Sequence, residues 1–195
     1  MALFGDGFRI SLQPASARVV RLRRTGRLGG AVPRRAIDLT NRGCEAEIST
    51  LITPSFELVG NYTRMRMGDS HGIPVVMVPD HAWAVFAKYT IRRGRSNGLG
   101  LSFGADHLGR RPGSTSESIR GETLVTAAGV PNQPSFYLAP RTVLQVGVSY
   151  RSERWKISVV AHNLTNKDYI RAATNRFSLE PGEPRNWSAA FELRW

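Results

Sequence analysis

Cysteine and histidine are scarce in this chain, which contains one cysteine and four histidines among 195 residues. Cys44 has no second cysteine with which to form an internal disulfide. The histidines, His71, His81, His107 and His162, are widely separated, and no Cys/His cluster has the spacing of a zinc site. We therefore expect solvated or pore-facing histidines, no metal site and no cofactor.

Long hydrophobic runs are also missing. Apolar residues make up 41 % of the chain, but no run approaches the roughly 20 residues that a membrane-spanning helix needs. A helical membrane protein is therefore excluded. A transmembrane β-barrel is not excluded, because its strands are apolar only at alternate positions.

Signatures of catalysis and export are absent as well. The sequence has no Ser/His/Asp or Cys/His arrangement, no paired-carboxylate site and no phosphate-binding glycine loop, so we expect no enzyme and no catalytic residues. Residues 1–10 lack the charged region, apolar stretch and small-residue cleavage site of a secretory signal. We expect no signal peptide in this chain.

Acidic residues are few relative to basic ones, and the net charge is +12. Nine arginines lie in residues 1–42, where only Asp6 and Asp38 oppose them. Such a basic arm suits nucleic acid or anionic lipid, but no interleaved aromatics or nucleic-acid motif accompany it. We expect no nucleic-acid partner. Residues 1–41 remain an unassigned Arg-rich segment, in which only Phe8–Leu12 alternates.

The clearest positive signal is the two-residue period at the C-terminus. Polar and small residues at 188, 190, 192 and 194 alternate with the apolar residues Trp187, Ala189, Phe191, Leu193 and Trp195. Only a strand places alternate residues on opposite faces. An apolar outer face, a polar inner face and a terminal aromatic are typical of the closing strand of an outer-membrane barrel.

The same alternation recurs in six earlier segments, which form three pairs: 44–52 with 55–66, 82–93 with 97–108, and 142–151 with 155–163. Short turns at 53–54, 94–96 and 152–154 join each pair, and the longer segments 67–81, 109–139 and 165–184 separate them. This pattern predicts an all-β, antiparallel, up-and-down sheet of about seven strands. With the C-terminus in the periplasm, all three long segments lie outside the cell, as in transmembrane barrels.

Two further patterns fit a barrel wall. Seven aromatics near strand ends have the positions of an interfacial girdle: Tyr62, Trp83, Tyr89, Tyr150, Trp155, Trp187 and Trp195. Gly98, Gly100 and Gly104 share one face of their strand, as expected where an inner wall needs close approach or curvature. Alternatively, the aromatics are the core of a soluble sandwich.

Several short motifs occur in a fixed order along residues 42–195. They are Arg42-Gly-Cys-Glu-Ala-Glu47, Thr53-Pro54, Gly60-Asn-Tyr-Thr63, Val78-Pro79, Lys88-Tyr89, Gly109-Arg-Arg-Pro112, Asn163-Leu-Thr-Asn-Lys-Asp-Tyr169, Pro181-Gly-Glu-Pro-Arg185 and the terminal Trp195. In this order, the segment resembles the C-terminal part of the β-barrel of TonB-dependent outer-membrane receptors, especially the ferric-siderophore kind.

The resemblance implies a 22-stranded barrel with a plugged lumen, of which this chain supplies about seven strands. It implies outer-membrane lipid as the surroundings, and a ferric siderophore and TonB as partners of the full-length family. The plug, the TonB-engaging motif and most of the barrel are not recognised here. We therefore expect a truncated fragment that does not transport alone.

The resemblance also suggests roles for particular residues. Trp187, Phe191, Leu193 and Trp195 would form the signal recognised by the barrel-insertion machinery. Phe136, Tyr137 and Arg141 lie where contacts to an anionic ferric chelate could sit, although the ligand-binding residues and the ligand itself are otherwise unknown. A self-contained small or porin-like barrel, a soluble β-sandwich binding module with a basic arm, and a non-functional remnant remain open alternatives.

Overall fold

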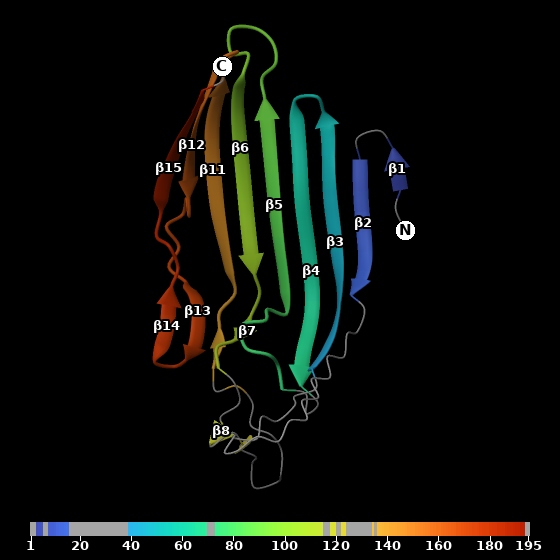
Figure 1. Cartoon of the computed structure of the whole chain (residues 1–195), viewed down its shortest axis with the longest axis vertical. Coiled ribbons are helices and arrows are strands. Elements are labelled where there is room, and N and C mark those ends of the chain that lie inside the picture. Colours follow the sequence, from blue (N-terminus) through green and yellow to red (C-terminus); the bar gives the residue numbers. More distant parts are fainter. Residues whose placement is uncertain are drawn as a thin grey trace, which may run out of the picture.

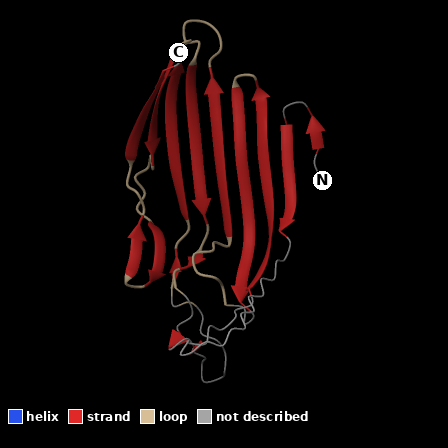
Figure 2. Ribbon diagram, viewed as in Figure 1, coloured by secondary structure: helices blue, strands red, loops and turns tan. Residues whose placement is uncertain are grey.

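A computed structural model describes residues 3–5, 8–15, 39–69, 73–114, 118–119, 122–123, 134 and 136–193. Side chains are described within residues 40–68, 73–114, 134 and 136–193. Every regular element in these ranges is a strand (Figure 2). No helix in the described ranges has the length and hydropathy needed to cross a membrane.

Nine strands form one sheet in the order β1-β2-β3-β4-β5-β6-β11-β12-β15, and every neighbouring pair is antiparallel (Figure 1). Their bounds are β1 Leu3–Gly5, β2 Phe8–Ala15, β3 Leu39–Thr53, β4 Phe56–Asp69, β5 His81–Thr90, β6 Leu99–Leu108, β11 Arg141–Arg151, β12 Trp155–His162 and β15 Asn186–Leu193. The last seven correspond to the seven predicted strands. The prediction of an all-β, antiparallel, up-and-down arrangement is confirmed.

Three small two-stranded sheets lie in the long connecting segments. They pair β7 (Arg111–Pro112) with β10 (Tyr137–Leu138), β8 (Ser118–Ile119) with β9 (Glu122–Thr123), and β13 (Ile170–Asn175) with β14 (Ser178–Pro181). The β13–β14 hairpin belongs to the connection between β12 and β15. These small sheets add local order to connections that the sequence predicted only as loops.

The N-terminal part of the sheet extends into the segment that the sequence left unassigned. Strand β2 includes the alternating stretch Phe8–Leu12 and pairs with β3 from Phe8↔Thr50 to Ala15↔Gly43. Strand β3 itself begins at Leu39, before the expected boundary at residue 42.

The register aligns the apolar positions of neighbouring strands on one face, here called the apolar face. One row crosses six strands through Leu58, Ala87, Phe103, Val146, Ala161 and Trp187. Much of this face is open: Leu101 is 50 % exposed and Phe191 is 66 % exposed. The opposite, polar face presents Lys88, Gln145 and Glu192. Because strand side chains alternate, each of the seven strands contributes to both faces.

A conventional hydrophobic core is absent from the described residues. Only five of their hydrophobic side chains are buried: Ile73, Ala105, Leu138, Ala161 and Ala173. A β-sandwich hides its alternate apolar residues between two facing sheets, whereas this large sheet leaves them uncovered. The described architecture is therefore one large sheet with an uncovered apolar face, and not a sandwich.

The two ends of the strands differ (Figure 1). The short β3–β4, β5–β6 and β11–β12 turns and the end of β15 lie at one end of the sheet, here called the turn edge. The long connections after β4, β6 and β12 leave from the other end, here called the loop edge. This asymmetry agrees with the prediction.

The three glycines that the sequence placed on one face of a strand, Gly98, Gly100 and Gly104, occupy two different kinds of position. Gly98 does not belong to the strand as predicted; it ends the preceding turn with φ of 91°, a conformation that suits glycine. Its carbonyl accepts a hydrogen bond from Arg151 N at 2.9 Å. Gly100 and Gly104 do lie on the polar face, where a Cβ would crowd Ser149 and Gln145.

Candidate functional site at the loop edge

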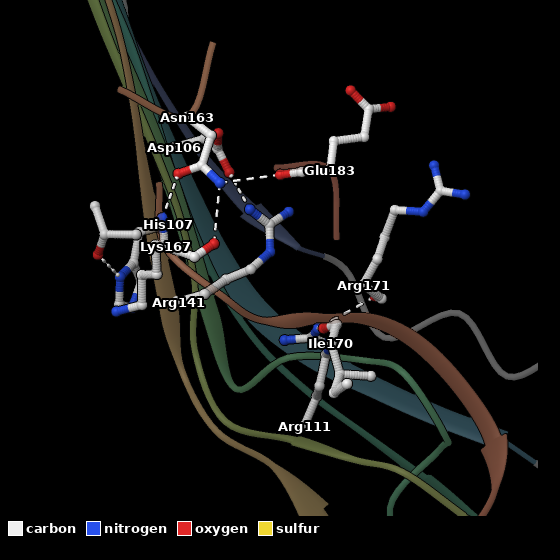
Figure 3. Close-up of polar contacts among 10 residues, drawn as sticks. Asp106, His107, Arg111, Arg141, Asn163, Lys167, Ile170, Arg171 and Glu183 are labelled. Carbon is white, nitrogen blue, oxygen red and sulfur yellow. Dashed lines mark hydrogen bonds and ion pairs between the residues drawn. The ribbon is translucent and has the colours of Figure 1, made fainter. Parts of the chain in front are cut away.

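Asn163 joins the beginning of the connection between β12 and β15 to the end of the same connection. Only 2 % of this residue is exposed, and its φ of 47° lies in the left-handed region that asparagine tolerates. Its Nδ2 donates to the carbonyls of Lys167 and Glu183, both at 2.9 Å, and its Oδ1 accepts from Lys167 N at 2.9 Å (Figure 3). The side chain is thus satisfied by backbone groups on both segments.

Two more contacts reinforce this junction. Asn166 also has a positive φ, 50°, and its Oδ1 accepts from Arg185 N at 2.9 Å. Gly182 N donates to Tyr169 O at 2.8 Å, and a Cβ on Gly182 would overlap the Tyr169 ring. The motifs at 163–169 and 181–185, which the sequence showed only as separate signatures, therefore form one clip.

Arg141 connects this clip to the sheet. It begins β11, and its Nη1 lies 2.9 Å from Asp106 Oδ2 in β6. Its guanidinium also lies over the Tyr169 ring, 4.5 Å from the centroid. Such a cation–π contact adds attraction between charge and ring. Arg141 thus contacts both the polar face and the segment following β12.

Arg111 is the most enclosed charged side chain in the described part of the chain, with 1 % exposure. Its Nη2 donates to the carbonyls of Ile170 at 2.8 Å and Arg171 at 3.2 Å, tying β7 to β13 (Figure 3). Burial lowers the pKa of the Arg111 guanidinium, and nearby Arg141 lowers it further. Nε and Nη1 of Arg111 have no hydrogen-bond partner among the described residues.

Two depressions lie on the polar side of the sheet. The one at the loop edge measures about 150 Å³, and its lining includes Asp106, Gln145, His162, Asn163, Tyr169 and Glu183. A wider one at the turn edge measures about 700 Å³ and includes Lys88, Arg92, Arg95, Arg151 and Lys156 together with Glu57 and Glu153. The first is small and carries two carboxylates, those of Asp106 and Glu183, whereas the second is predominantly basic.

Two of the four histidines meet at the loop edge. His81 Nε2 lies 3.2 Å from His107 Nε2, although 26 positions separate the two residues in the chain. His162 lies apart from them, 3.0 Å from Ser188 Oγ, and His71 is outside the described residues. Among described residues, no group of three or more His, Cys, Asp or Glu side chains could hold a metal ion.

The three residues proposed for ligand contact all lie near the loop edge. Tyr137, in β10, is 36 % exposed and has the Arg110 guanidinium 4.0 Å from its ring centroid. Phe136 is half-buried beside Gly113, and Arg141 is engaged by Asp106. Their role in binding a ligand stays a prediction.

The proposed assembly signal lies on β15. Trp187, Phe191 and Leu193 are 67 %, 66 % and 59 % exposed on the apolar face, while Trp195 is outside the described residues. Within the described chain, β15 pairs only with β12. Recognition by an insertion machinery remains a prediction, but three of the four side chains are accessible for it.

No protein-family model matches this chain, but a curated protein and several solved structures are similar to it. The metal-pseudopaline receptor CntO of Pseudomonas aeruginosa strain UCBPP-PA14 is 24 % identical over 161 residues, which cover 80 % of this chain and 21 % of the receptor. The chain therefore spans about a fifth of the length of this curated relative.

Solved structures share the fold. The ferripyoverdine receptor of the Pseudomonas aeruginosa outer membrane aligns with a TM-score of 0.67 and 19 % identity, covering 94 % of this chain and 24 % of the receptor chain. The ferric yersiniabactin uptake receptor FyuA of Yersinia pestis aligns with a TM-score of 0.70 and 13 % identity, covering 98 % and 28 %. The predicted resemblance is confirmed: this chain resembles TonB-dependent outer-membrane receptors of the ferric-siderophore kind, and its fold is that of a C-terminal portion of their β-barrel.

Proposed function

We propose that the chain forms part of the wall of an outer-membrane receptor that takes up ferric siderophores. The observation that carries this proposal is the exposed apolar face, which runs in register across β4, β5, β6, β11, β12 and β15. In water, such a face is unfavourable, whereas in a bilayer it meets lipid. The polar face would then line the lumen.

The strand ends suggest an orientation. Long connections leave from the loop edge, which would face outside, and the short turns of the turn edge would face the periplasm. The outer loops would help to capture an anionic ferric chelate, with Phe136, Tyr137 and Arg141 as candidate contacts. This assignment is supported by the receptors that share the fold.

Transport would require more than the described sheet. Within the described residues β15 has β12 as its sole neighbour, so one row of backbone groups has no partner strand. An unpaired edge in lipid costs several kcal/mol for each unsatisfied group. We infer that further strands, a plug and coupling to TonB are needed for uptake, and that this chain alone does not transport.

A labelling experiment tests the membrane orientation. The chain is exported with an added signal sequence into a Gram-negative host in a Cys44→Ser background. Phe177→Cys places a thiol on the β13–β14 hairpin, where Phe177 is 99 % exposed, and Glu153→Cys places one in the β11–β12 turn. A membrane-impermeant maleimide should label residue 177 on intact cells and residue 153 only after permeabilisation. Equal labelling, or release of the chain without detergent, would refute the orientation or the membrane location.

A chimaera tests the receptor function. Residues 39–193 replace the matching segment of the ferripyoverdine receptor, and binding of radiolabelled ferric siderophores to outer membranes is measured. We expect the exported chain alone to bind none and the chimaera to bind. Arg141→Ala in the chimaera should weaken binding of an anionic chelate, whereas Glu153→Ala at the opposite edge should not. A folded chimaera that binds no siderophore tested would count against the proposal.

The insertion signal is tested separately. In the exported chain, Phe191→Ser should reduce the amount of heat-modifiable protein in the outer membrane. Glu192→Ser alters the neighbouring residue on the polar face of the same strand and is the control. If both variants insert as the unchanged chain does, β15 is not the signal.

A further inference from the structure

His81 and His107 face each other on adjacent strands at the loop edge. His81 begins β5, and His107 lies one residue before the end of β6, opposite Trp83 in the register. Their Nε2 atoms are 3.2 Å apart, and their rings are inclined by only 20°. The paired strands therefore hold two nitrogen ligands close together although 26 positions separate the residues in the chain.

The other ring nitrogen of each histidine is held by an oxygen. His81 Nδ1 lies 2.9 Å from Asp80 Oδ1, and His107 Nδ1 lies 2.8 Å from Thr142 Oγ1. An ionised carboxylate can only accept, so it fixes the His81 proton on Nδ1 and leaves a lone pair on Nε2. Histidines that bind metals are held in this way, by an oxygen on the nitrogen that does not face the metal.

The separation of the two Nε2 atoms suits a shared metal ion. Two nitrogens bound to one tetrahedral ion at about 2.0–2.1 Å are about 3.4 Å apart. The observed 3.2 Å needs only a small adjustment. Without an ion, one Nε2–H donates to the other Nε2. When an ion binds, the His107 proton moves to Nδ1, which then donates to the Thr142 hydroxyl.

We propose that His81 and His107 form a two-histidine site for a divalent transition-metal ion such as Zn²⁺, Ni²⁺ or Cu²⁺. Imidazole suits these ions. Asp80 and Thr142 are positioning residues. Since the described residues offer no third ligand of the His, Cys, Asp or Glu type here, water or an incoming chelator completes the coordination. The two histidines lie at the loop-edge end of the apolar face, where the His81 side chain is 37 % exposed and therefore open to an ion.

The site has a structural consequence. A bound ion would join β5 directly to β6, and the His107–Thr142 contact would extend that link to β11. These three strands lead into or out of the two connections at 70–80 and 109–140. The inference depends on the fold alone and does not require the chain to be part of a siderophore receptor.

The test measures metal binding by the purified full chain in detergent micelles, in a Cys44→Ser background and without a histidine tag. Titration calorimetry with Zn²⁺ should show one site. His107→Gln should weaken Zn²⁺ binding at least tenfold, and Asp80→Asn about tenfold, as typical for loss of an outer-shell partner. His162→Gln is the matched control because His162 lies apart, beside Ser188, and it should leave the affinity unchanged.

A second readout does not depend on a histidine substitution. Trp83 stacks on His107 with ring centroids 5.3 Å apart. Bound Cu²⁺ should therefore quench Trp83 fluorescence, and Trp83→Phe should abolish this quenching while Zn²⁺ binding persists. The electron paramagnetic resonance spectrum of the Cu²⁺ complex should show two nitrogen ligands. No Zn²⁺ binding by the folded chain, equal affinity in folded His107→Gln, or a Cu²⁺ spectrum without two nitrogens would each overturn the proposal.

Discussion

The side-chain amide of Asn163 donates to the backbone carbonyl of Glu183, and this bond joins segments 20 residues apart in the chain. It lies just beyond the last register pair of β12 and β15, His162↔Asn186. The bond therefore holds together the two ends of the connection that contains the β13–β14 hairpin. We expect this contact and its neighbours to stabilise the loop edge.

Asn163→Ala should destabilise the fold by about 2–3 kcal/mol, because three hydrogen bonds of roughly 1 kcal/mol each are lost in a buried site. Alanine also tolerates the positive φ less well than asparagine. Urea unfolding of the chain in detergent measures the effect. Leu164→Ala, at a neighbouring side chain that is 36 % exposed, is the control and should cost less. Equal costs would show that the Asn163 bonds contribute little.

Gly182→Ala should destabilise by about 1–3 kcal/mol, the usual range for overpacking, because the new methyl group meets the Tyr169 ring. A double-mutant cycle with Tyr169→Ala should show coupling, since removal of the ring makes room for the methyl group. Gly94→Ala, whose added Cβ meets nothing within 4 Å, should show no coupling to Tyr169. Additive costs for Gly182 and Tyr169 would contradict the assigned contact.

Arg111→Met should change the unfolding free energy by less than about 1 kcal/mol, because the lost bonds are offset by removal of a buried charge with unpaired donors. The β13–β14 hairpin should nevertheless be cleaved faster in limited proteolysis, since Arg111 no longer holds Ile170 and Arg171. Arg110→Met, at an exposed neighbouring position, should leave the cleavage rate unchanged. A loss of several kcal/mol in Arg111→Met would indicate that its free donors are satisfied in the intact molecule.

Val148→Arg should destabilise the chain in a lipid bilayer by up to about 2–4 kcal/mol, the cost of a cation at the midplane of the lipid face, which falls toward the interfaces. Val148 lies on the apolar face of β11 and is 47 % exposed. Gln145→Arg places the same charge on the polar face of that strand and should cost much less. Urea titration in lipid vesicles distinguishes the two. Similar costs for both variants would mean that the apolar face does not contact lipid.

The strands were predictable because their signal is local. Alternation along β15, seen at Trp187, Phe191 and Leu193, requires only that successive strand residues face opposite sides. Turn residues between the pairs then defined the antiparallel order. The β2–β3 pairing was not predicted, since β2 shows only a short alternating stretch and joins a partner whose first residue, Leu39, lies 24 positions beyond the end of β2.

The sequence by itself determined the seven strands, their apolar and polar faces, and the separation of short turns from long connections. Only the tertiary structure decided that His81 meets His107, that Asn163 reaches Glu183, and that Arg111 is enclosed. The physical reason is that a strand's faces follow from its own backbone geometry. Contacts between distant side chains depend instead on the register of neighbouring strands and on the path of the connections, which no local pattern specifies.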